Sequence, residues 1–469
     1  MNKKTISLLR LAVCMAFVMT LLIATAAPSL ATTINAEGAL VGTEQIPANA
    51  AITKCLAVGQ ETPTPQVTFT FQIDKVSLND LTDSASLSAM PTITNKTITF
   101  GPADAYNSAL TNAQQIHKRL DQTDYLYKEG AETLFPSTVN WTRSGIYVYR
   151  VTEQQSGFPY LSANEVATYS KAVYQLTVYV AEKTGGGFYV WAIGARRVTN
   201  DDGTVNAGNT GPKVDCRPGG PNGTYQFDFS KMIFTNTYLR RGGGGTTPTD
   251  GKLKISKVVT SLGADSFKYF EFDVTIRKPI ISDKANYRVY VFEVNAQGQT
   301  VPVTGYTSLQ NNVQNASLIH TSGAYIEYPL SPPGTVVRFR LRHNQFLSFS
   351  DIDAGATYVV NEQSHTPTDY TPSYLLTKSG TAAGTMTGTP GSSLSTPSTP
   401  PMTVTISPTN AWMDTAAFSN KFKDVVPTGI AVDDLPYFAI VAIAAIALGG
   451  YLFLRVKVRK NDEVAVEAN

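Results

Sequence analysis

Three residue types recur in the same order in both halves of the chain: a lysine, a glutamate and an asparagine. In the first half they are Lys54, Glu153 and Asn236, in the segments Ile52-Thr-Lys54, Tyr149-Arg-Val-Thr-Glu153 and Phe234-Thr-Asn236. The second half repeats them as Lys257, Glu362 and Asn420, in Ile255-Ser-Lys257, Tyr358-Val-Val-Asn-Glu362 and Phe418-Ser-Asn420. An ordered repeat of this kind indicates a duplicated unit, so these six residues are the first candidates for chemistry.

A lysine, a carboxylic acid and an asparagine amide can react with one another where they are buried together. Burial lowers the pKa of a lysine and raises that of a glutamate, because each charged form loses solvation. A neutral amine can then attack the carbonyl carbon of the asparagine side chain, while the carboxyl group transfers protons. Ammonia leaves and an amide cross-link remains. The alternative is a buried Lys–Glu ion pair with the asparagine as a hydrogen-bonding neighbour; two matching sets favour the cross-link.

Strands must position these residues, because apolar side chains alternate with period two in both halves. Examples are Val67-Thr-Phe-Thr-Phe-Gln-Ile73 and Val336-Val-Arg-Phe-Arg-Leu341. Many such half-buried strands in succession predict an all-β fold of the sandwich type. First and last strands of a sandwich often lie side by side, which would bring Lys and Asn of one unit together among aromatic residues. A few helical turns are expected around 108–120, and the Gly/Ser/Thr/Pro-rich segment 379–402 is expected to be a mobile loop.

Composition limits the function. The chain has 469 residues, which suggests about three folded units. Its net charge is +2, from 38 basic and 36 acidic side chains, and this balance argues against a nucleic-acid partner. Four His and three Cys leave little material for a metal centre. We therefore expect no metal and no cofactor.

The two ends of the chain predict its compartment. A basic start, an apolar run from Leu8 to Ala27 and small residues after it indicate a secretory signal peptide within a leader at 1–37. At the other end, 425–469, the apolar segment 435–454 is long enough to span a bilayer as a transmembrane helix, and a basic tail follows it. We expect an extracellular protein on the surface of a bacterium.

Between these ends the mature region divides in two. A Gly-rich linker at 241–250 has no capacity to form a core. It separates an N-terminal domain at 38–240 from a C-terminal domain at 251–424, each large enough for its own core.

The C-terminal end has the order of a sorting signal. A pentapeptide that contains Pro-Thr-Gly, an apolar helix and a basic tail resemble the cell-wall sorting signal of Gram-positive sortases. Those transpeptidases cut between Thr and Gly, here Thr428 and Gly429. Val425-Val426 stands where the common form has Leu-Pro, so the motif is a variant.

Taken together, the six repeated residues and the segment Asn420-Lys-Phe-Lys-Asp-Val-Val-Pro-Thr-Gly429 resemble the two-domain streptococcal T-antigen type of major pilin. The resemblance implies two immunoglobulin-like sandwiches, each locked by an isopeptide bond. Lys54 would join Asn236 with Glu153 assisting. Lys257 would join Asn420 with Glu362 assisting. This cross-linking is self-modification, so we do not expect an enzyme.

The resemblance also implies partners. A sortase would link Thr428 to a lysine of the neighbouring pilin subunit and finally to peptidoglycan. The accepting lysine in that family lies shortly before the first domain's terminal asparagine, which points to Lys231, with Lys213 as runner-up; for either one, an ordinary surface lysine is the alternative. The competing function is a monomeric wall-anchored adhesin or ancillary pilin that binds a host ligand.

Two cysteines remain after removal of the signal peptide, Cys55 and Cys216, both in the first half. Two cysteines in one domain of a secreted protein favour a disulfide. The alternative is a pair of buried or reactive thiols. Cys55 adjoins Lys54 and therefore points to the opposite face of its strand.

Overall fold

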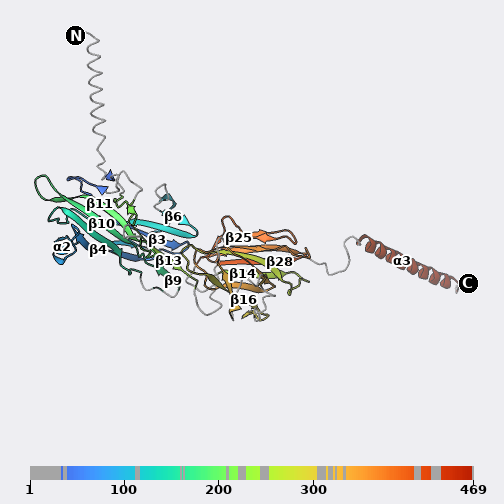
Figure 1. Cartoon of the computed structure of the whole chain (residues 1–469). Helices are drawn as coiled ribbons and strands as arrows, with labels where there is room; N and C mark the ends of the chain where they lie inside the picture. The colour runs from blue at the N-terminus through green and yellow to red at the C-terminus, as the bar shows by residue number, and fades with distance from the viewer. Residues whose placement is uncertain are drawn as a thin grey trace, which may run out of the picture.

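The computed structural model shows an elongated protein in which two β-rich lobes follow one another along the chain (Figure 1). The structure describes residues 33–34, 40–110, 117–158, 161, 164–206, 211–219, 229–242, 253–303, 313–314, 321–322, 325–330, 334–405, 414–423 and 435–466.

The first lobe contains two sheets within the described residues. One has the order β1 (Thr33–Ile34), β2 (Leu40–Val41), β11 (Phe188–Thr199), β10 (Val173–Glu182), β8 (Gly145–Glu153), β4 (Val67–Leu78) and β5 (Lys96–Phe100), with β12 (Lys213–Val214) beside β11. The other has the order β6 (His117–Leu120), β7 (Thr123–Glu129), β3 (Thr53–Gly59), β13 (Ile233–Arg240) and β9 (Glu165–Thr168). A short helix, α2 (Ser84–Ala89), stands between β4 and β5 in the chain. Side chains of both sheets form one buried core, as the alternation of apolar residues requires.

The second lobe repeats this plan, again as far as it is described. Its larger sheet has the order β19 (Thr321–Ser322), β20 (Tyr325–Pro329), β16 (Asn286–Val294), β22 (Gln345–Phe349), β14 (Leu253–Thr260), β28 (Asp414–Phe422), β24 (Tyr370–Lys378) and β25 (Thr381–Thr387), with β17 (Thr300–Pro302) beside β16. The smaller sheet has the order β18 (Val313–Gln314), β21 (Val336–Leu341), β15 (Phe270–Arg277), β23 (Thr357–Glu362) and β26 (Leu394–Ser395), with β27 (Met402–Thr403) beside β23. The predicted all-β fold is confirmed.

In both lobes the strand that carries the cluster lysine pairs in parallel with the strand that carries the asparagine. In the first lobe β3 runs beside β13, and in the second β14 runs beside β28. Parallel pairing of strands so distant in sequence needs a core that covers them, and every residue of β3 is buried. The expected juxtaposition of the lysine strand and the asparagine strand is therefore present twice, although in the first lobe the short strands β1 and β2 precede β3 in the chain.

Two local predictions were wrong. Residues 108–110 form a short 3₁₀ helix, η1 (Ser108–Leu110), but 117–120 form strand β6 rather than helical turns. Part of the segment 379–402, expected as a mobile loop, is built into sheets, with β25 paired antiparallel to β24 and β26 paired to β23. Ser379 (φ 50°) and Gly380 (φ 76°) make the turn, and positive φ at both positions suits a two-residue hairpin.

The two lobes touch where β13 ends. The backbone N–H of Gly242 donates to Ile352 O at 2.8 Å, and Arg241 Nε lies 3.2 Å from Asp353 Oδ1, a carboxylate that is fully buried. Lys378 Nζ also lies 2.6 Å from Glu61 Oε1 across the junction. The first two residues of the expected linker are thus part of a packed contact.

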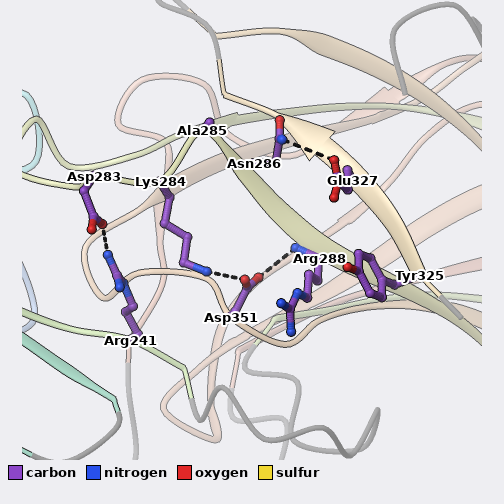
Figure 2. A pocket seen from close by; sticks show the side chains of 9 residues that line it. All are labelled: Arg241, Asp283, Lys284, Ala285, Asn286, Arg288, Tyr325, Glu327 and Asp351. Carbon is purple, nitrogen blue, oxygen red and sulfur yellow. Dashed lines mark hydrogen bonds and ion pairs between the residues drawn. The ribbon is translucent and has the colours of Figure 1, made fainter. Parts of the chain in front are cut away.

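A polar pocket lies beside this junction. Arg241 pairs with Asp283, Lys284 pairs with Asp351, and Asn286 lies 3.4 Å from Glu327 (Figure 2). The basic side chains of Arg241 and Lys284 are therefore neutralised by acidic neighbours.

The segment 435–454 begins helix α3 (Leu435–Val466), the helix at the C-terminal end in Figure 1. Within the part of the chain that the structure describes, no helix meets both the length and the apolarity needed to cross a membrane. Except for 33–34, the leader at 1–37 lies outside the described residues.

Candidate functional site

The first candidate cluster lies between the two sheets of the first lobe. Lys54 is on β3 and Asn236 is on the neighbouring strand β13, where the register pairs Phe234 with Lys54 and Asn236 with Leu56. Side chains two residues apart on a strand share a face, so both polar groups point into the core. Glu153, the last residue of β8, reaches them from the opposite sheet.

The three side chains are in direct contact. Lys54 Nζ lies 2.6 Å from Glu153 Oε2, and Asn236 Nδ2 donates to Glu153 Oε1 at 2.5 Å. The backbone N–H of Ser170 donates to Asn236 Oδ1 at 2.6 Å. The side chains of Lys54 and Glu153 are fully buried. Each carboxylate oxygen thus serves one partner.

Aromatic rings keep water from this cluster. Lys54 Nζ lies 4.5 Å from the centre of the Phe69 ring. The Phe234 ring packs 5.0 Å from Phe71 and 5.1 Å from Tyr174, between centroids. The apolar surroundings expected from the sequence are present.

The second cluster reproduces the first. Lys257 on β14 pairs with Phe418 on β28, and Asn420 lies two residues further on, opposite Val259. Glu362, the last residue of β23, comes from the other sheet. Lys257 Nζ and Asn420 Nδ2 each lie 2.7 Å from Glu362 Oε1.

One difference separates the two clusters. In the second, both partners use the same carboxylate oxygen, and among the described residues neither Glu362 Oε2 nor Asn420 Oδ1 has a hydrogen-bond partner. The rings around it are equivalent: Lys257 Nζ lies 4.3 Å from the centre of Phe270 and 5.6 Å from that of Phe272.

Burial sets the charge of these groups. It lowers the pKa of Lys54 and of Lys257 to about 8, against the opposing effect of the nearby glutamate. Burial likewise raises the pKa of Glu153 and of Glu362, although the lysine and asparagine contacts pull them down. Both shifts favour the neutral amine with the neutral acid, the forms that amide exchange requires.

The structure thus brings the six repeated residues together as two sets of three. Thr428 and Gly429 lie outside the described residues. Lys231 precedes β13, with Nζ 4.1 Å from the Phe229 ring centre, and Lys213 is exposed on β12. The role of either lysine in linkage stays a prediction.

The expected disulfide is wrong. Cys55 and Cys216 are both free and buried, which is the alternative left open by the sequence. Cys216 packs into the core between the sheets, whereas Cys55 faces away from it, toward Tyr127. The two thiols therefore belong to different faces, and burial raises the pKa of each to about 12.

Sequence reasoning missed two residues beside the first cluster, Ser170 and Asp201. Ser170 Oγ donates to Asp201 Oδ1 at 2.5 Å, and Asp201 sits in a segment, Asn200-Asp-Asp-Gly203, whose residues indicate only a turn. No signal in the sequence connects this turn to Asn236. Among the described residues no group of His, Cys, Asp or Glu could hold a metal ion.

Comparison with known families shows what the first lobe is similar to. Residues 50–239 match the Spy0128-like isopeptide containing domain, and this range contains the whole first cluster. The first lobe is therefore similar to this isopeptide containing domain, in line with the resemblance noted in the sequence. Residues 251–395 of the second domain match a domain of unknown function, DUF7601.

The solved structures to which the chain is similar include pilus proteins. The major pilin from Streptococcus pyogenes is 16% identical, with 81% of this chain and 100% of that chain covered and a TM-score of 0.27. The T3.2 major pilin of the same species is 14% identical, with 81% and 98% covered and a TM-score of 0.26. A pilus-presented adhesin, Spy0125 (Cpa), is 12% identical, with 58% and 38% covered and a TM-score of 0.18. No curated protein matches the chain.

The two thiols should react only after unfolding. In the folded mature chain, we expect Cys55 and Cys216 to resist alkylation, because both are buried and their pKa values of about 12 leave little thiolate. In denaturant without a reductant, both should be alkylated. Intact mass counts the added groups. If the denatured chain takes up none without a reductant, Cys55 and Cys216 are joined in a disulfide after all.

Proposed function

We propose that this protein is the structural shaft subunit of a covalently polymerised surface pilus, stabilised by Lys–Asn isopeptide bonds that it makes itself. The observation that carries the proposal is the duplication of one buried cluster at the same register of two parallel strands, one with the lysine and one with the asparagine, in both domains. A structural ion pair has no need of an asparagine amide against the same carboxyl group. The match of the first domain to an isopeptide family supports this interpretation.

The contacts of the first cluster suit the reaction. A proton passes from Lys54 to Glu153 within the ion pair, which leaves a neutral amine beside a neutral acid. Nζ then attacks Cγ of Asn236, and the new C–N bond replaces the bond from Cγ to Nδ2. The neutral carboxyl group gives its proton to Nδ2, which leaves as ammonia, and takes one proton from Nζ, which becomes positively charged on attack; both nitrogens lie within hydrogen-bond distance of Glu153. The acid is neutral before and after this exchange, so no cofactor is needed.

The position of the bonds explains their use. Each one would join two adjacent parallel strands that lie near the beginning and at the end of a domain, so tension along the chain would pass through the bond rather than through most of the sheet. Closing a loop of roughly 100 residues or more also removes unfolded-state entropy, worth about 5 kcal/mol on the model used for disulfides. A fibre one molecule thick would need this at every subunit.

Assembly would use the ends of the chain. A sortase would cleave between Thr428 and Gly429 and pass the threonine carbonyl to Lys231, or to Lys213, of a neighbouring subunit, and finally to peptidoglycan. The protein would then lie outside the cell, as a surface polymer of a Gram-positive bacterium. Its only chemistry would be on itself, so we do not propose an enzyme.

The mass of the chain tests the cross-links. The reduced and denatured 38–424 segment should be lighter than its sequence by two ammonia molecules, about 34 Da, because each bond is a covalent modification that removes one. Glu153→Gln should restore one ammonia and Glu362→Gln the other, since each removes the proton carrier of one domain only. Glu182→Gln, at an exposed glutamate of β10, is the matched control and should leave the deficit at two.

A wild-type chain of unmodified mass would reduce both clusters to ion pairs and remove the basis of the proposal. Peptide mapping identifies the linked residues where the deficit is one ammonia.

The rate of cross-linking should have a plateau in pH. The reactive form has a neutral lysine and a neutral glutamic acid, and it carries as many protons as the ion pair. The fraction of molecules in this form is therefore independent of pH between the two pKa values. Above about pH 8 the pair loses a proton, because the pKa of Lys54 and of Lys257 is about 8, and the acid needed by the leaving group is gone. Below the raised pKa of the glutamates the amine stays protonated.

The measurement is ammonia loss, followed by mass, after dilution of unfolded and unlinked chain into buffers of different pH. Tryptophan fluorescence separates the rate of folding from that of bond formation. A rate that continues to rise well above pH 8 would show amine attack without acid assistance.

Polymerisation separates the shaft from the adhesin alternative. Cells that express the protein with its sortase should yield ladders that resist boiling in detergent, and Thr428→Ala should abolish them because it removes the acyl donor. Lys231→Arg should also abolish them, whereas Lys213→Arg should not. Wall-anchored monomer without ladders in the wild type would favour the adhesin.

A further inference from the structure

The connection between β9 and β10, residues 169–172, presents a backbone donor to the amide that the proposed reaction attacks. The N–H of Ser170 donates to Asn236 Oδ1 at 2.6 Å. Ser170 is 1% exposed and Asn236 is fully buried, so water does not compete for this oxygen. When an amine attacks an amide carbon, the C–O electron pair moves onto the oxygen, and it returns when ammonia leaves. The Ser170 N–H points at the atom where that charge develops.

Asp201 holds the connection 169–172 in this position. Its Oδ1 accepts from Ser170 Oγ at 2.5 Å and from the backbone N–H of Thr235 at 2.8 Å. Its backbone carbonyl accepts from Lys171 N at 2.9 Å. One aspartate thus connects residues 169–172 to β13, at the residue directly before Asn236.

The second domain lacks this arrangement among its described residues. Strand β24 lies beside β28, and its register places Pro372, which has no N–H, opposite Asn420. Asn420 Oδ1 has no hydrogen-bond partner in the part of the chain that is described. The two clusters therefore share lysine, acid and amide but differ in what meets the amide oxygen.

We infer that the Ser170 N–H is an oxyanion donor for the Lys54–Asn236 bond, held in place by Asp201 as a positioning residue, and that the Lys257–Asn420 bond forms without a counterpart from the described residues of its domain. This inference rests on the cross-linking reaction proposed above. Removing one such donor from an acyl-transfer site slows the reaction by about 10²–10³-fold. The first domain should consequently link faster than the second.

Three variants of the full-length chain test this: Asp201→Ala, Asp201→Asn and Ser170→Ala. Each is made by cell-free translation in mild detergent, quenched at intervals in acidic urea and digested. Linked and linear peptides of both clusters are then quantified. The rate of the Lys257–Asn420 bond in the same molecule is the internal reference for the rate of the first bond.

In the wild type the first bond should form faster than the second. Asp201→Ala and Ser170→Ala should slow the first bond about tenfold, a part of what complete loss of an oxyanion donor costs, and leave the second unchanged. Asp201→Asn keeps an oxygen that can accept from Ser170 Oγ and Thr235 N–H, so it should stay close to the wild-type rate. That rescue separates positioning from the negative charge of Asp201.

The inference would be overturned if the ratio of the first-bond rate to the second-bond rate were the same in the wild type, Asp201→Ala and Ser170→Ala. It would also be overturned if Asp201→Asn formed the first bond as slowly as Asp201→Ala. Ser170→Ala removes only a hydroxyl group. If Asp201→Ala does not fold, the first-bond rate of Ser170→Ala tests the inference. A wild-type chain that forms neither bond would instead overturn the proposed function itself, which is a different result.

Discussion

Each domain of this protein is arranged around one lysine amine held in an aromatic core. A charged amine without a partner is costly to bury, so Lys54 and Lys257 each require a carboxylate from the opposite sheet. Removing one member of a buried pair costs roughly 3–5 kcal/mol. The pairing therefore constrains how the two sheets face each other, and burial shifts the pKa of both groups toward the neutral forms.

The same constraint explains why the strand with the lysine and the strand with the asparagine are neighbours in both domains. The asparagine has to lie on the face of the lysine and within reach of the same carboxyl group. A parallel neighbour with a two-residue offset satisfies both conditions, as Asn236 opposite Leu56 and Asn420 opposite Val259 show. Since β13 ends at the packed contact between the lobes, a bond at this site would lie on the direct path of tension through the chain.

The two domains differ where the reaction would be tuned. The lysine, the acid and the amide are duplicated, but the amide oxygen meets a backbone donor in one domain and none among the described residues of the other. The groups that carry charge and protons are therefore the same in both domains, whereas the segment beside the amide oxygen differs.

Much of this was already determined by the sequence. The period-two alternation predicts strands and the face of each side chain, which is why the six cluster residues and their aromatic surroundings were identifiable. Alternation does not say which strand or turn lies beside a given face. For that reason Cys55 and Cys216 were expected to pair although they belong to different faces, and strand β25 was expected to be part of a loop. Ser170 and Asp201 reach Asn236 through contacts between segments 31 to 66 residues apart, and only the packing of the two sheets decides such contacts.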